Sequence, residues 1–204
     1  MFINENRIII LFISLLLSII SIAQEKVSWS YTIEKKSDDW FGTEEAKKIA
    51  ENVLLYQRDI GGWPKNIEMQ NDIALTDKQK LLDLKSDPNG CTTDNGATCQ
   101  EMLFLSKMYR QIPDERYRDS FLKGLDYLME AQYQNGGWPQ FYPLKKGYYT
   151  HITYNDDSMV NILNLLKNLK EGKHVYAIEP SEEIIEKIKI AFNKGIDCIL
   201  KTQY

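Results

Sequence analysis

The sequence predicts an all-α fold, an incomplete α/α barrel of repeated helix pairs. Apolar residues recur at intervals of three and four along several segments, which is the spacing of one helix face. No segment alternates convincingly between apolar and polar residues, so strands are not expected. The motif Gln-x-x-x-Gly-x-Trp occurs twice, at residues 57–63 and 132–138, each time at the end of an amphipathic segment. Helix pairs that repeat in this way bury their faces on their neighbours.

Composition and charge restrict the class of protein. The 204 residues are 43% hydrophobic and 26% charged, which suits one globular domain. The net charge is −4 and no basic residues cluster, so nucleic acid is not an expected partner. We expect a monomer.

Residues 1–23 have the pattern of a cleaved secretory signal peptide. A polar start with one cation, Arg7, precedes an apolar run from Ile8 to Ile22, and small residues, Ser21 and Ala23, lie before the cleavage point. An uncleaved membrane anchor is the alternative, but the run is shorter than the roughly 20 residues that cross a bilayer. We therefore expect a secreted or periplasmic protein with no membrane contact after signal cleavage.

The rest of the chain divides into an irregular lead-in, residues 24–42, and a helical part, residues 43–204. Thr43, Asp114 and Ser181 are predicted N-caps, and Thr76 with Gln79 forms a predicted capping box. The last three residues resemble residues 131–133, so we expect an amino-terminal part of a larger domain, truncated at the C-terminus. The predicted helices run from Thr43 to about Gln57, from Thr76 to about Ser86, from Gly96 to about Gln111, from Asp114 to Tyr133, from the 153–159 loop to Gly172, and onward from Ser181.

Two acidic loops are the main candidates for a site. Asp94 and Asn95 precede one predicted helix, and Asp156 and Asp157 precede another. Each aspartate is either a helix cap or a ligand of a hard cation, because carboxylate and amide oxygens suit Ca²⁺ and no His/Cys set has zinc spacing. His151 lies close by in sequence and is either a site residue or a loop hydrogen bonder.

The two tryptophan turns offer further candidates. Trp63 and Trp138 either stack on sugar rings or plug the space between helices. Lys65, which follows Trp63 closely, is a candidate contact for an anionic ligand. Cys91 and Cys99 flank Asp94 and are either bridged or small buried thiols.

These motifs together resemble the polysaccharide lyase family 10 pectate lyases. The resemblance rests on Thr93–Thr98, on Tyr154–Met159 and on both Gly-Gly-Trp-Pro turns, and it extends from about Thr43 to Tyr204. It implies an α/α toroid, secretion and Ca²⁺-dependent cleavage of polygalacturonate or oligogalacturonates by β-elimination. It also implies that Asp94 and Asp156 bind the calcium. Asn95 and Asp157 then lie behind these ligands or contact substrate, as Lys65, His151 and Trp63 are expected to do.

The implied chemistry explains why carboxylates would line a site for a polyanion. Elimination removes the proton at C5 of a galacturonate, and a bound Ca²⁺ neutralises the neighbouring carboxylate. The resemblance also implies that the catalytic base is an arginine. None of Arg58, Arg110, Arg116 and Arg118 matches the motif of that arginine, so we expect it beyond Tyr204.

Two other functions remain open. One is a non-catalytic uronate-binding fragment. The other is a different α/α-barrel enzyme, such as a glycoside hydrolase with Asp94 and Asp156 as acid and base. A terpene cyclase has a similar turn, but the export signal and the polar loops argue against it.

Overall fold

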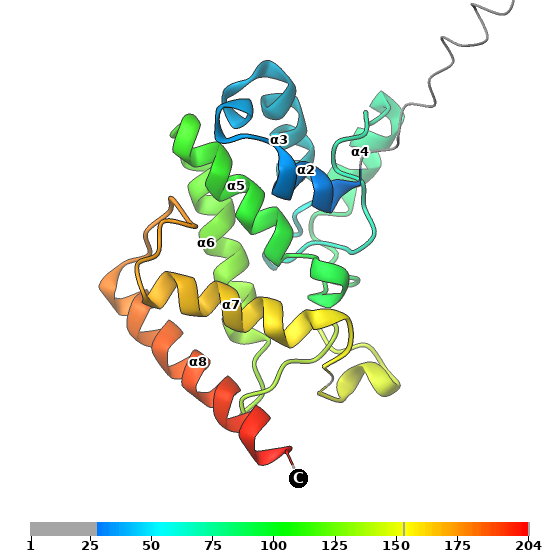
Figure 1. Ribbon diagram of the computed structural model, residues 1–204. Helices are drawn as coiled ribbons and strands as arrows, with labels where there is room; N and C mark the ends of the chain where they lie inside the picture. The colour runs from blue at the N-terminus through cyan, green and yellow to red at the C-terminus, as the bar shows by residue number, and fades with distance from the viewer. Residues whose placement is uncertain (1–27, 153, 204) are drawn as a thin grey trace, which may run out of the picture.

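The computed structural model describes residues 28–152 and 154–203, and the expected signal peptide lies outside this part of the chain. The described residues form an all-α fold, as predicted, with two isolated β-bridges and no strand (Figure 1). None of the described helices is long and apolar enough to cross a membrane. The α-helices are α2 (Trp29–Lys35), α3 (Glu44–Tyr56), α4 (Leu75–Asp83), α5 (Cys99–Gln111), α6 (Glu115–Glu130), α7 (Ser158–Lys170) and α8 (Glu182–Lys201).

Neighbouring helices pack in pairs. Helix α5 packs against α6, and α7 packs against α8, with α5 and α7 in contact between the pairs (Figure 1). Helix α3 lies against α5 and α6 at the other end of the row. Short 3-10 turns lie between the helices, namely η1 (Asp38–Gly42), η2 (Asp94–Gly96), η3 (Tyr148–Thr150) and η4 (Asn155–Asp157).

Three predicted N-caps are confirmed. The side chain of Thr43 accepts a hydrogen bond from the backbone N–H of Ala46 at 3.2 Å. The side chains of Asp114 and Ser181 cap α6 and α8 in the same way. Each supplies a partner for a backbone donor that the helix itself leaves free.

Two other predictions about the helices are wrong. The capping box at Thr76 does not form, because α4 already begins at Leu75 after Ala74, without a side-chain cap, and it ends at Asp83. The lead-in is also not irregular over its described residues, which form α2 and η1. Ser28 caps α2, and the backbone N–H of Trp29 donates to Glu68 at 2.7 Å. This second bond crosses between distant parts of the chain, which local sequence patterns do not reveal.

The tryptophan turns are built alike. In the first, Gln57 Nε2 donates to the carbonyls of Gly61 and Ser120, both at 2.9 Å. In the second, Gln132 Nε2 donates to the carbonyl of Gly136 at 2.9 Å and to that of Ala191 at 2.8 Å. Each glutamine therefore ties its own turn to the next helix in the row.

The tryptophan of each turn is part of the core. Trp63 has 0% of its surface exposed, and its Nε1 donates to the carbonyl of Val53 at 2.8 Å. Trp138 is 2% exposed and donates to Leu128 in the same way. The prediction that Trp63 contacts substrate is therefore wrong, because no ring face is available for a sugar. Both residues plug the space between helices.

The cysteines are not bridged. Cys91, Cys99 and Cys198 are free thiols and all three are buried. Burial raises the pKa of Cys91 and of Cys99 to about 12, so both remain protonated.

Candidate active site

Both acidic loops form 3-10 turns with left-handed residues. Asn95 has φ 53° inside η2, and Asp156 has φ 50° inside η4. Asp157, which follows directly, has φ 55°. Asparagine and aspartate tolerate this conformation better than most residues, which explains their use at these positions.

Neither candidate calcium ligand is a helix cap. The residue before α5 is Thr98, and Asp94 lies in the separate turn η2. The residue before α7 is Asp157, whose side chain makes no capping hydrogen bond, and Asp156 lies inside η4. Capping, the alternative that the sequence left open for both aspartates, is therefore wrong.

The two turns are held together by buried hydrogen bonds. Thr93 Oγ1 and Ser158 Oγ lie 2.6 Å apart, which joins the start of η2 to the start of α7. Thr92 Oγ1 accepts from the backbone N–H of Asp94 at 3.1 Å and donates to the carbonyl of Gln140. These buried hydrogen bonds connect the two loops and so fix their relative position.

Asp94 and Asp156 converge at this junction. The turns η2 and η4 that carry them are in contact, and the carboxyl group of Asp156 is close enough to affect the pKa of Asp94. Asp94 is 1% exposed and Asp156 is exposed, so the pair is open to solvent on one side. Two neighbouring carboxylates repel each other, so the pair is a candidate site for a cation.

Asp94 is buried but ionised. Its Oδ2 accepts from Lys65 Nζ in an ion pair, while its Oδ1 is buried and finds no partner among the described residues. Burial acts to raise the pKa of Asp94, but hydrogen bonds from Lys65 and Gln140, together with the Lys65 charge, outweigh it and lower the pKa. A buried carboxylate oxygen without a hydrogen-bond partner is a candidate ligand atom for a water or a cation.

An aromatic and cationic wall lies beside the acidic pair. Lys65 Nζ is 5.6 Å from the ring centroid of Phe141. Lys145 Nζ lies 4.9 Å from the same ring and 4.6 Å from that of Tyr149. The pKa of the exposed Tyr148 is raised chiefly by its hydrogen bond to Tyr149, and the charges of Asp94 and Asp156 add to this. Sequence reasoning missed this wall and Gln140, although the aromatic content of residues 141–154 was visible.

The other predicted site residues are placed differently. Asn95 is exposed, and its Nδ2 donates to Asn66 Oδ1 at 2.9 Å, which bridges η2 to the loop of Lys65. Asp157 is exposed beside Asp156. His151 is also exposed, but it lines another pocket, with Tyr133 and Asn135. The structure therefore brings together Asp94, Asp156 and Lys65, with Asn95 at the edge.

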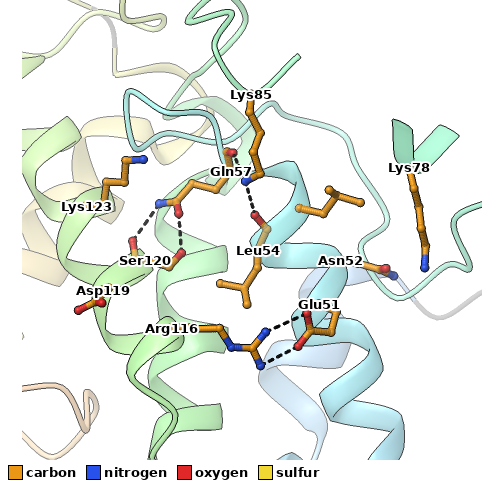
Figure 2. A pocket seen from close by; sticks show the side chains of 11 residues that line it. Glu51, Asn52, Leu54, Gln57, Lys78, Lys85, Arg116, Asp119, Ser120 and Lys123 are labelled. Atoms are coloured by element: carbon orange, nitrogen blue, oxygen red, sulfur yellow. Dashed lines mark hydrogen bonds and ion pairs between the residues drawn. The ribbon is translucent and has the colours of Figure 1, made fainter. Parts of the chain in front are cut away.

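A second groove, of about 560 Å³, lies apart from these residues between α3 and α6 (Figure 2). Its polar groups bond to one another. Arg116 Nη2 contacts Glu51 at 2.9 Å, and Lys85 Nζ donates to the carbonyls of Leu54 and Gln57 at 2.9 and 3.1 Å. These contacts connect α3 to its neighbours, so we interpret the groove as part of the structural packing and not as a binding site.

Within the described part of the chain, no group of three or more His, Cys, Asp or Glu side chains is arranged to hold a metal ion. The acidic pair thus offers two carboxylates and no complete cage. Since Ca²⁺ takes six to eight oxygen ligands, a calcium ion at this pair requires further oxygens from water or a bound ligand.

Comparisons with a family model and with solved structures point to the same family. The family model described as pectic acid lyase matches residues 57–204. Among solved structures, the family 10 polysaccharide lyase from Cellvibrio cellulosa is 34% identical over 81% of this chain and 50% of that chain, with a TM-score of 0.62. A mutant of that lyase in complex with trigalacturonic acid is 33% identical with the same coverage and a TM-score of 0.63. A search of the curated proteins found no match.

The fold and these similarities define a chain of the polysaccharide lyase class. More narrowly, it belongs to the pectic acid lyase family, whose pattern matches well over half of its residues. The resemblance found in the sequence is therefore confirmed. The chain spans about half the length of the solved structures that it matches.

Proposed function

We propose that this protein is part of a secreted, calcium-dependent pectate lyase that cleaves polygalacturonate by β-elimination. The observation that carries the proposal is the convergence of Asp94 and Asp156 beside Lys65. The complex of a similar lyase with trigalacturonic acid supports an oligogalacturonate ligand. The apolar amino-terminal pattern in residues 1–23 supports secretion.

The acidic pair fits a calcium ion. Asp94 Oδ1 is a buried hard donor without a partner among the described residues, and the adjoining Asp156 adds a second carboxyl group. Asp94 and Asp156 would hold the ion from the two loops. When bound, Ca²⁺ supplies positive charge that neutralises a uronate carboxylate and so acidifies the proton at C5.

The remaining residues position and orient the substrate. Lys65 keeps Asp94 ionised and places a cation at the opening of the site. Lys145, beside Phe141 and Tyr149, adds a cation and an aromatic surface where a sugar face can rest. The Thr93–Ser158 hydrogen bond keeps the two loops in register. Such positioning lowers the reaction barrier most when fixed protein groups face the negative charge that develops on the uronate.

The proton-abstracting group is proposed to lie outside this chain. The arginine that the resemblance implies has no counterpart near the acidic pair. Arg110 bonds to the carbonyl of His174, Arg116 pairs with Asp114 and Glu51, and Arg118 pairs with Glu115 within α6. Arg58 is buried in the first tryptophan turn. Among the described residues none of these arginines is bonded to Asp94 or Asp156, so none is proposed as the base.

The test uses the full-length secreted protein with polygalacturonate. Elimination produces a new double bond in the uronide, and we expect its absorbance to rise with Ca²⁺ present and to stop with a chelator. Asp94→Asn should lower kcat/KM by about 10²- to 10³-fold, as loss of one preorganised charge does. Asp126→Asn, an exposed residue on α6, is the control and should keep full activity. No absorbance rise in the presence of calcium would refute the proposal.

A non-catalytic uronate-binding function is the second candidate, because the implied base has no match among these residues. It predicts calcium-dependent binding of trigalacturonic acid without any double-bond product. A glycoside hydrolase would instead shorten the polymer and give products without the new absorbance.

A further inference from the structure

A polar pocket of about 150 Å³ adjoins the acidic pair and has no role in the mechanism above. Its walls come from residues 28–30, 64–68 and 95–101. Lys65 and Asn95 line the pocket, and Lys65 is bonded to Asp94. Lys65 therefore connects the pocket to the acidic pair.

The pocket contains a buried carboxyl group with an unused oxygen. Glu101, in the first turn of α5, is 2% exposed and lines the pocket. Its Oε1 accepts from Trp29 Nε1 at 2.8 Å, whereas its Oε2 is buried and has no partner among the described residues. A buried oxygen in this state carries a desolvation cost that a ligand hydroxyl would remove.

The charge of the pocket selects against another uronate. Glu68 is its second carboxylate, and its Oε2 accepts from the backbone N–H of Trp29 at 2.7 Å. Among the residues that line the pocket, Lys65 is the one cation, and its charge is already paired with Asp94. Burial raises the pKa of Glu101 to about 7, so Glu101 and Glu68 are both ionised only above that pH. There the pocket is negative, because Lys65 is already paired with Asp94. A ligand carboxylate is then repelled and hydroxyl donors are attracted.

We propose that this pocket is a specificity subsite for an uncharged sugar residue, a methyl-esterified galacturonate, next to the uronate held at Asp94 and Asp156. The proposal rests on the proposed function for its substrate class. The sugar's hydroxyls donate to Glu101 Oε2 and to Glu68. Pockets for larger ligands have volumes of about 300 to 1,000 Å³. This pocket is smaller, so we assign it to one sugar ring of the polymer.

The test compares two ligands on the full-length protein by calorimetry with Ca²⁺ present, at a pH well above the raised pKa of Glu101 so that both carboxylates of the pocket are ionised. One ligand is trigalacturonic acid and the other is its partially methyl-esterified form. The parent should bind the esterified ligand about three- to tenfold more tightly, as one avoided charge repulsion near a surface provides. Glu68→Gln and Glu101→Gln remove the repulsion, so each should reduce this preference, and the double variant should abolish it. Glutamine preserves an acceptor for the N–H groups of Trp29.

Glu130→Gln, an exposed residue on α6, is the matched control and should keep the parent preference. Circular dichroism verifies the fold of each variant, and Glu68→Gln, at an exposed position, keeps the test valid if Glu101→Gln does not fold. An equal affinity of the parent for both ligands, or a preference that survives the double variant, would overturn the subsite. Turnover of polygalacturonate with such a result would leave the lyase proposal standing. Absence of turnover with a preference that the double variant removes would leave the subsite standing alone.

Discussion

The ionisation of Glu101 is linked to folding. Burial raises its pKa from 4.5 to about 7, against the hydrogen bond from Trp29 and those from backbone N–H groups. The folded protein therefore holds this proton more tightly than the unfolded chain does. The stabilisation from this bound proton is complete below the pKa of Glu101 in the unfolded chain. It is lost as the pH rises through the pKa of Glu101 in the folded protein.

Glu101→Gln should remove this dependence. Relative to the variant, the parent should lose about 3 kcal/mol of unfolding free energy between pH 4.5 and pH 8, at about 1.4 kcal/mol for each unit of pKa difference. Urea titrations at several pH values measure the difference. The exposed Glu130→Gln variant should follow the parent at every pH. Parallel curves for the parent and Glu101→Gln would show that Glu101 ionises equally in both states.

At the same scale, the sequence predicted the residues that carry charge but not their surroundings. Asp94, Asp156 and Lys65 were recognised because each lies in a motif with other polar residues. Gln140, Tyr148 and Glu101 were not, because their contacts come from segments far apart in the chain. Glu101 itself looks like an ordinary acidic residue in the first turn of a helix. Only its burial against Trp29 distinguishes it.

At the scale of the elements, helices with a strong apolar stripe and a polar cap were predictable. Helices α3, α6 and α8 begin after Thr43, Asp114 and Ser181, as the local pattern required. Helix α5 begins at Cys99, later than expected, because Asp94–Gly96 forms its own turn. Helix α2 was missed because long-range bonds from Trp29 to Glu68 and Glu101 support its short sequence.

The tryptophan turns make the repeat testable. Gly61 has φ +106° and Gly136 has φ +94°, both in the left-handed region. A Cβ would lie 2.2 Å from the Lys123 carbonyl oxygen in the first turn and 2.0 Å from that of Lys194 in the second. Gly61→Ala and Gly136→Ala should therefore each lower the unfolding free energy by more than about 3 kcal/mol, from strain and steric clash together.

Gly90→Ala is the matched control for these variants. Gly90 has φ +86°, but nothing lies within 4 Å of a Cβ placed there. Gly90→Ala therefore introduces backbone strain without a steric clash and should lower the unfolding free energy by about 1 kcal/mol. Chemical denaturation of the three variants separates the two contributions. An equal cost at all three positions would mean that the turns tolerate the extra atom and do not lock successive helices together.

For the whole molecule, the net charge would not attract the polyanion that we propose as substrate. The net charge is −4, so the protein and polygalacturonate repel each other on average. The proposed binding would therefore depend on local cations, which Lys65 and Lys145 supply beside the acidic pair. The same pair is short of oxygens for a complete calcium shell, since no larger metal-binding group occurs among the described residues. We therefore infer that calcium and substrate bind interdependently, each supplying what the other lacks.

This interdependence should appear in the stability of the protein as a whole. A ligand that binds only the folded state stabilises it by about 2.7 kcal/mol at one hundred times its Kd. We expect Ca²⁺ alone to raise Tm slightly, and Ca²⁺ with trigalacturonic acid to raise it by more than the two separate effects combined. Asp94→Asn and Asp156→Asn should remove the joint effect, while Asp126→Asn should retain it, as differential scanning calorimetry would show. A full shift with Ca²⁺ alone would mean that the protein completes the calcium shell itself. A joint shift that survives Asp94→Asn would place the ion elsewhere.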